Sequence, residues 1–389
     1  MFYIRLYICF FILSNGLYCQ NFQFNLNDRA EVLFLNNAYA NTVSTLRLSE
    51  TFEPSSYYSK NYLILLSKLR NNETGADRQL PYYLEKNPIS KLGSTLPFDM
   101  GNFYFKNNKY SYALKWYRNL NDDQFMNELK DKFNFNKGYS LFHVKRYSAA
   151  KPYLEKVKNT RQYESDAHYY LGHIAYQMDD YINAESEFSQ LDNKFSSKND
   201  LDYFQVDMNF KLGRFQQAID LGNKLLKKSN ILYESDLSKI VGESHFNLKN
   251  YKESLPFLVA YKGIKDKWTN EDFYQLGYAY YSEKKYDSAI DQFNKIINQS
   301  NSLSQNAFYH LGDCYLKEEK KIEALSAFKK ASEMNFNKKI KEDALLQYAK
   351  LGFEIGNPFE SYTNVLIRFL NTYPKNKYSE KIKSLLVLS

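Results

Sequence analysis

The strongest constraint on the fold is a residue pattern that returns about every 35 positions. In its clearest copy, Leu276-Gly277 is followed by Tyr280, Tyr286, Ala289 and Phe293. The next copy has Leu311-Gly312, then Tyr315, Ala324 and Phe328. The glycine position falls at residues 101, 138, 172, 206, 242, 277, 312 and 350, so the intervals are 34 to 38 residues. A period of this length predicts stacked copies of one small structural unit.

Each copy predicts a pair of amphipathic helices. The stretch from Glu271 to Ile297 reads as two helices joined at the EKK of residues 283–285. An interior glycine costs a helix about 1 kcal/mol relative to alanine. We expect Gly277 and Ala289 to face each other, so that the two helices approach closely and Tyr280 and Phe293 pack around the contact.

The small residues recur at both positions in most copies, whereas Val206, Ser254 and Lys350 depart from the pattern. The predicted structural positions are Gly101, Ala113, Gly138, Ala150, Gly172, Ala184, Ala218, Gly242, Gly277, Ala289, Gly312 and Ala324.

These copies resemble the tetratricopeptide repeat (TPR) over about residues 90–378. The TPR pattern is a large apolar residue, Leu-Gly and Tyr, then Tyr, Ala, Phe and Ala with a closing Pro, and the copy at 271–297 matches it at Phe273, Leu276, Gly277, Tyr280, Tyr286, Ala289 and Phe293. The resemblance implies an all-α, right-handed superhelical solenoid of helix-turn-helix repeats. It also implies similarity to exported, periplasmic bacterial TPR proteins.

The chain ends differ from the repeats. Residues 1–19 contain Arg5, an apolar run from Leu6 to Leu13 and then small polar residues, which is the layout of a signal peptide. Residues 24–90 read as divergent helical repeats, followed by an array of about eight repeats over 91–378. Residues 379–389 predict a helix that either caps the last hairpin or is the stump of a longer solenoid.

Composition disfavours several classes of function. The net charge of +8 comes from 52 basic and 44 acidic residues that are interspersed, and only ten of the basic residues are arginines, so we expect no nucleic-acid partner. The apolar run of the leader is shorter than a membrane span, so we expect none in the mature chain. Of the three cysteines, Cys9 and Cys19 lie in the leader and Cys314 is expected to be a small core residue.

The sequence contains no nucleotide-binding, nucleophile-elbow or zinc-protease motif, and no calcium loop. The five histidines do not have metal-ligand spacing. We therefore predict no enzyme activity, no metal and no cofactor. A hidden catalytic site is a third alternative, which predicts a pocket of convergent polar groups.

The remaining candidate is a surface. In the TPR family the first helix of each hairpin lines the concave side of the superhelix, and positions three before and four after the glycine would point into it. At flanking positions Lys106, Lys132, Lys211 and Lys317 are opposed by acids such as Asp166, so we expect no carboxylate clamp. The predicted peptide-binding groove consists of Phe98, Phe105, Phe135, Phe142, Tyr169, Tyr176, Tyr203, Phe210, Tyr274, Tyr281 and Tyr309. The alternative is that these rings mainly pack neighbouring hairpins together.

The function that follows is an exported, non-catalytic scaffold or adaptor of the periplasm or cell envelope, which holds a protein or peptide in its concave groove. The alternative is a structural or self-assembling spacer without a groove ligand, which the apolar LLVL near the C-terminus favours. Self-association is left open.

Overall fold

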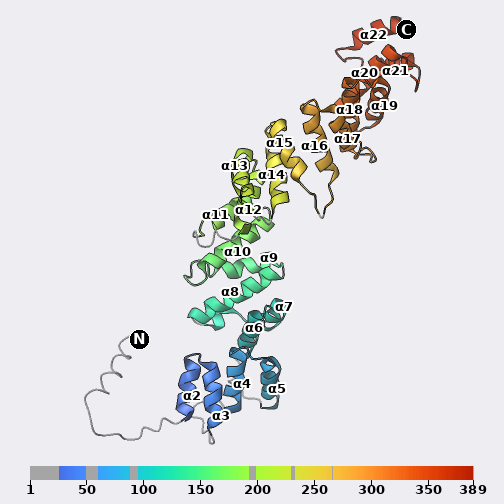
Figure 1. Ribbon diagram of the computed structural model, residues 1–389. Coiled ribbons are helices and arrows are strands. Elements are labelled where there is room, and N and C mark those ends of the chain that lie inside the picture. The colour runs from blue at the N-terminus through green and yellow to red at the C-terminus, as the bar shows by residue number, and fades with distance from the viewer. Residues whose placement is uncertain are drawn as a thin grey trace, which may run out of the picture. The chain divides into compact units, whose positions relative to one another are not determined.

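The computed structural model describes residues 26–49, 60–87, 95–125, 127–191, 199–228, 233–264 and 266–388. Within these ranges the chain forms 21 α-helices, α2 to α22 (Figure 1). Extended pairing in these ranges is limited to a single bridge between Ile264 and Lys267. The predicted all-α helical-repeat fold is thereby confirmed, and the hand of the superhelix stays a prediction. The predicted signal peptide, with Cys9 and Cys19, lies outside the described residues.

The chain divides into two compact units between Met178 and Asp179. In unit 1 the helices pair in sequence, and α6 packs against α4 and α8 as well as against its hairpin partner α7. The helices of unit 1 are α2 (Leu26–Leu35), α3 (Tyr39–Leu48), α4 (Lys60–Arg70), α5 (Ala76–Lys86), α6 (Leu96–Lys106), α7 (Tyr110–Tyr117), the 3-10 helix η2 (Asp122–Gln124), α8 (Asn127–His143), α9 (Tyr147–Glu155) and α10 (Glu164–Gln177).

In unit 2 the first helices also contact one another from hairpin to hairpin: α14 packs against α16, α16 against α18 and α18 against α20. The final helix packs against α21 and buries Ile382. The helices of unit 2 are α11 (Tyr181–Phe188), α12 (Asn199–Lys211), α13 (Phe215–Leu226), α14 (Glu234–Asn247), α15 (Tyr251–Ala260), α16 (Asn270–Ser282), α17 (Tyr286–Phe293), α18 (Ser302–Lys317), α19 (Lys321–Glu333), α20 (Lys338–Ile355), α21 (Tyr362–Thr372) and α22 (Ser379–Val387).

The turn between α16 and α17 consists of residues 283–285, as the sequence predicts. Lys284 adopts a left-handed conformation with φ of 59°. Its N–H donates to the carbonyl of Tyr281, and the N–H of Lys285 donates to that of Tyr280. This pair of bonds is the Schellman motif, which ends a helix and satisfies its last carbonyls. The same left-handed turn position is occupied by Asn37, Asn72, Asn108, Lys145, Gly213, Lys249 and Glu319.

In five hairpins a glycine of the first helix makes room for a large side chain of the second helix. A Cβ added to Gly277 would lie 2.9 Å from the ring of Phe293, closer than real side chains pack, and Ala289 is not among its nearest neighbours. The glycine accommodates the residue 16 positions later, which the sequence expected to pack around this contact, and the facing of Gly277 and Ala289 stays a prediction. The same relation holds for the pairs Gly101–Tyr117, Gly138–Leu154, Gly242–Leu258 and Gly312–Phe328. In every pair a Cβ added to the glycine would lie less than 3.0 Å from the large side chain.

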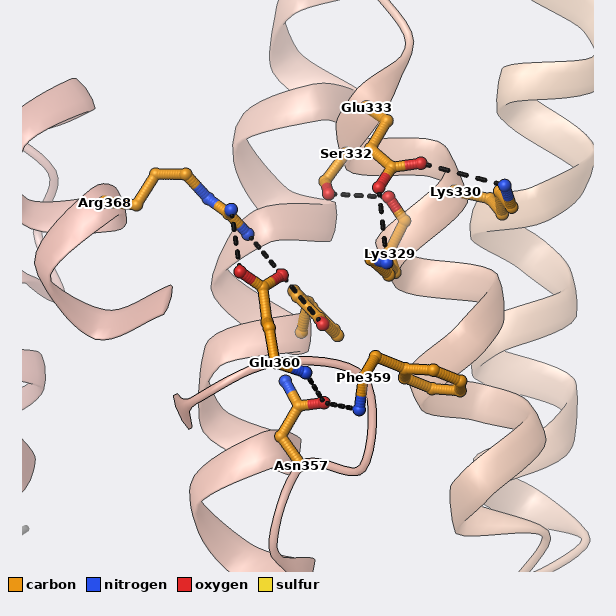
Figure 2. A network of polar contacts seen from close by, with 9 residues as sticks. Lys329, Lys330, Ser332, Glu333, Asn357, Phe359, Glu360 and Arg368 are labelled. Carbon is orange, nitrogen blue, oxygen red and sulfur yellow. Dashed lines mark hydrogen bonds and ion pairs between the residues drawn. The ribbon is translucent and has the colours of Figure 1, made fainter. Parts of the chain in front are cut away.

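The last hairpin departs from the repeat because α20 and α21 are joined by a longer loop, residues 356–361. Glu360 holds this loop in place, because it accepts two hydrogen bonds of 3.0 Å from Arg368 (Figure 2). It also accepts one of 3.0 Å from the hydroxyl of Tyr348. The side chain of Asn357 accepts from the backbone N–H of Phe359 at 2.9 Å. Lys350, predicted at the glycine position of this copy, is half-buried with its ammonium 4.2 Å from the ring centre of Tyr378.

Candidate functional site

The eleven aromatic residues of the predicted groove are all at least half-buried. Phe98, Phe135, Phe142 and Tyr169 are each less than 10% exposed, and the other seven are half-buried. The rings connect neighbouring repeats; Phe135, for instance, stacks on Tyr163 with ring centres 4.6 Å apart. Packing therefore uses much of each ring, and their role as a groove lining stays a prediction.

Two of these tyrosines bind carboxylates on the next first helix. The hydroxyl of Tyr281 donates to Asp313 at 3.1 Å, and that of Tyr309 donates to Asp343. Burial, followed by these carboxylates, raises the pKa of both tyrosines. The hydroxyls therefore stay protonated and tie α16 to α18 and α18 to α20.

Unit 1 contains a cleft of about 420 Å³ to which three consecutive first helices, α4, α6 and α8, contribute. Its walls combine aromatic rings, such as those of Tyr39, Phe98 and Phe125, with charged groups. The charged lining residues are Arg70, Asp99, Lys106 and Lys132, three cations and one anion.

The single acid of this cleft is already neutralised. Arg70 donates to both carboxylate oxygens of Asp99, at 3.0 and 3.1 Å, and Asp99 is 7% exposed. Burial opposes the charge on Arg70, but the ion pair outweighs it and raises the pKa of Arg70. A bidentate pair of this kind is fixed in geometry and charge. Asp99 therefore compensates the charge of Arg70 and leaves the charges of the two lysines in the cleft uncompensated.

The two lysines differ in exposure. Lys106 is exposed and donates to the backbone carbonyl of Arg70 at 3.2 Å. Lys132 is half-buried, and burial lowers its pKa, with the charge of Lys106 as the next cause and Asp99 acting in the opposite direction. A lysine in this position gains from an external anion, because the anion restores the interactions that water supplied.

Lys106 and Lys132 stand out in the sequence at positions flanking the predicted groove, but Arg70 and the convergence of all three cations do not. A signal for it does exist in the sequence. Arg70 and Lys106 both stand two residues before a left-handed turn residue, Asn72 and Asn108, so they occupy one repeat position on adjacent first helices. Lys132 stands six residues before Gly138, where the later repeats have Asp166, Asp236 and Glu271.

Unit 2 contains a second cleft, of about 530 Å³, formed by α11, α12 and α13. Its single cation, Arg214, donates to Glu185 at 2.8 and 3.1 Å. Asp220, also in the lining, accepts from Gln216 at 2.9 Å. The two clefts thus differ in charge: the cleft of unit 1 has an excess of cations and that of unit 2 does not.

The potentially reactive side chains Cys314 and His310 lie outside both clefts and are packed into the protein interior. Cys314 is fully buried, and burial raises the pKa of its thiol to about 12, which disfavours the reactive thiolate. His310 lies among Tyr278, Tyr281 and Phe293, and burial lowers its pKa to about 4. In the described ranges no three His, Cys, Asp or Glu side chains are placed to hold a metal ion, and no helix there is long and apolar enough to span a membrane.

Comparisons with known proteins find similarity to helical-repeat proteins. The family model "Anaphase-promoting complex, cyclosome, subunit 3" matches residues 258–331, which are 74 of the 389 residues. No curated protein matches. The solved C-terminal part of a TPR repeat-containing protein from Cytophaga hutchinsonii is 18% identical, with 64% of this chain and 98% of that chain covered and a TM-score of 0.44.

Two further solved structures of TPR proteins also match this chain. A tetratricopeptide repeat protein from Parabacteroides merdae is 14% identical, with 84% of this chain and 96% of that one covered and a TM-score of 0.29. YrrB, described as a TPR protein with an unusual peptide-binding site, is 20% identical, with 61% and 96% covered and a TM-score of 0.27. The repeats of the present chain are TPR-like by their own residues and helix pairing.

Proposed function

We propose that this chain is an exported, non-catalytic TPR-type adaptor that holds a protein or peptide segment against its first helices. The observation that carries the proposal is the cleft of unit 1, where α4, α6 and α8 present aromatic walls and charged groups together. Stacked helical repeats create long binding surfaces of this kind. An aromatic-walled cleft with a few charged groups suits an extended segment of a partner.

Export to the periplasm rests on residues 1–19 of the sequence. We propose that this leader is removed and that the array then acts in the cell envelope. Alkaline phosphatase fused after residue 49 tests this, because the enzyme is active only after export. An active fusion that loses its activity when residues 2–19 are deleted supports export, and an inactive full-length fusion contradicts it.

Partner binding is tested by site-specific photo-crosslinking of the full chain in its native host. Leu129, at the cleft of unit 1, and Asn247, both exposed on first helices, receive the crosslinking residue. Tyr112 and Ile182, which are 53% and 68% exposed on second helices, are the matched control positions. The adaptor proposal expects discrete adducts from the first pair in preference to the second. Equal adducts from all four positions, or none, contradict it.

The spacer alternative retains one specific observation. In α22 the side chains of Leu385 and Leu386 pack against the last core, whereas Val387 and Leu388 are 87% and 76% exposed. Two exposed apolar side chains at one end favour contact with another copy. Sedimentation equilibrium distinguishes the two functions, because a spacer that self-assembles gains mass with concentration and Val387→Ser plus Leu388→Ser abolishes the gain.

A further inference from the structure

We propose that the cleft of unit 1 selects an acidic internal segment of the partner, one in which two carboxylate side chains flank an aromatic or large apolar side chain. This inference deepens the proposed adaptor function and rests on it. The carboxylates pair with Lys106 and Lys132, and the apolar side chain packs against the exposed apolar lining of the cleft at Leu129.

The charge balance of the cleft determines the sign of the ligand. Asp99 is held by both donors of Arg70, so the lining retains a net charge of +2. Asp99 raises the pKa of Lys132, but its attraction is weaker than the effects of burial and of Lys106, which lower that pKa. Two lysines that line one concavity attract anions and raise their local concentration.

The position of the two lysines on different helices determines how the carboxylates of the ligand are arranged. Lys106 belongs to α6 and Lys132 to α8, and each is a point charge without the planar fork of an arginine. The one guanidinium of the cleft is occupied by Asp99. Two separate carboxylates therefore fit the cleft better than one terminal carboxylate gripped by convergent donors.

The walls favour a peptide over a nucleic acid. Phe98 is only 5% exposed, and the centre of its ring lies 4.8 Å from that of Phe125 and 6.5 Å from that of Phe133. Its faces are therefore used in packing, and stacked bases require open faces. Leu129, which is 51% exposed at the cleft, offers apolar surface to a side chain instead.

The test is fluorescence polarisation with the full chain and four probes. The first is an N-acetylated, C-amidated peptide with two glutamates flanking a phenylalanine. The second has glutamine in place of both glutamates. The third is the glutamine peptide with a free C-terminal carboxylate, and the fourth is a single-stranded oligothymidylate. We expect the first to bind and the glutamine form to bind about tenfold more weakly or worse, with affinity falling as salt rises.

Matched variants locate the binding. Lys106→Met plus Lys132→Met should lower the affinity for the glutamate peptide about tenfold or more. Lys211→Met plus Lys317→Met is the control, since both residues occupy the repeat position of Lys106 but lie in unit 2, and it should leave the affinity unchanged. Circular dichroism checks that each variant retains the helical fold.

The outcomes separate this inference from the adaptor function. Four outcomes would each overturn the acidic-segment proposal. The first two are equal binding of the glutamate and glutamine peptides and a preference for the peptide with the free carboxylate. The other two are equal competition by the oligonucleotide and an equal effect of the unit 2 control variant and the cleft variant. Each of these leaves the crosslinking result for the adaptor intact. Loss of first-helix adducts in the crosslinking experiment overturns the adaptor function itself.

Discussion

Val206 and Gly222 face each other across the α12–α13 hairpin with the usual sizes exchanged. A Cβ on Gly222 would lie 3.5 Å from Val206 and would overlap with Val241 of α14. In five other hairpins the first helix has the glycine and the second helix has the large residue, 16 positions apart. Here the large residue is on the first helix and the glycine is on the second. The close approach that requires this glycine is therefore to Val241 of the next hairpin, because the distance to Val206 is an ordinary van der Waals contact.

The first prediction concerns this pairing of sizes. Gly277→Ala should destabilise unit 2 by about 1–2 kcal/mol, because overpacking against the ring of Phe293 costs more than the gain in helix propensity. Phe293→Leu, which copies the Gly138–Leu154 pair, should cost less when combined with Gly277→Ala than it does in the native protein. Urea denaturation followed by circular dichroism measures both. Additive costs would contradict the pairing.

The second prediction concerns the turns. Lys284 has a φ of 59°, which costs a residue with a side chain about 1–2 kcal/mol relative to glycine. Lys284→Gly should therefore stabilise unit 2, by about 1 kcal/mol after the entropy of glycine in the unfolded chain is included. Gly213→Ala is the matched reverse change: φ is 73° and no atom lies within 4 Å of the added Cβ, so its cost reports backbone strain alone. Thermal unfolding should move in opposite directions for the two variants.

The third prediction concerns a buried amide. Gln305 is fully buried on α18; it donates to the carbonyls of Ala331 and Met334, at 3.0 and 2.9 Å, and accepts from the N–H of Asn337 at 2.6 Å. Gln305→Met should destabilise unit 2 by about 2–4 kcal/mol, because it leaves buried backbone groups without partners. Gln216→Met, at an exposed position, should cost less than about 0.5 kcal/mol. A similar cost at both sites would show that the bonds of Gln305 contribute little.

The fourth prediction concerns pH. Burial lowers the pKa of His310 from 6.5 to about 4, so the unfolded state binds the proton first as pH falls. The contribution of His310 to stability is therefore present above about pH 6.5 and is lost progressively down to about pH 4. Over that interval unit 2 should lose on the order of 3 kcal/mol through this residue. In His310→Phe this part of the loss disappears, while all other titrating groups remain. Parallel stability–pH curves for the two proteins would exclude the effect.

The sequence by itself determined the periodic part of this protein. Small and large residues at fixed intervals can be buried only by stacking like hairpins, so the helices and the EKK turn followed from local pattern. It did not show how closely the ring of Phe293 approaches Gly277, because spacing within a helix shows which residues share a face and not how far a side chain reaches toward the other helix.

Tertiary structure alone decided the cleft of unit 1. Three helices supply the charged residues Arg70, Asp99, Lys106 and Lys132, and in the linear sequence these residues are separated by others of both signs. Folding pairs Asp99 with Arg70 and leaves the two lysines beside each other in one concavity. The reason is physical: electrostatic compensation depends on distances between helices, and these are set by how the hairpins stack.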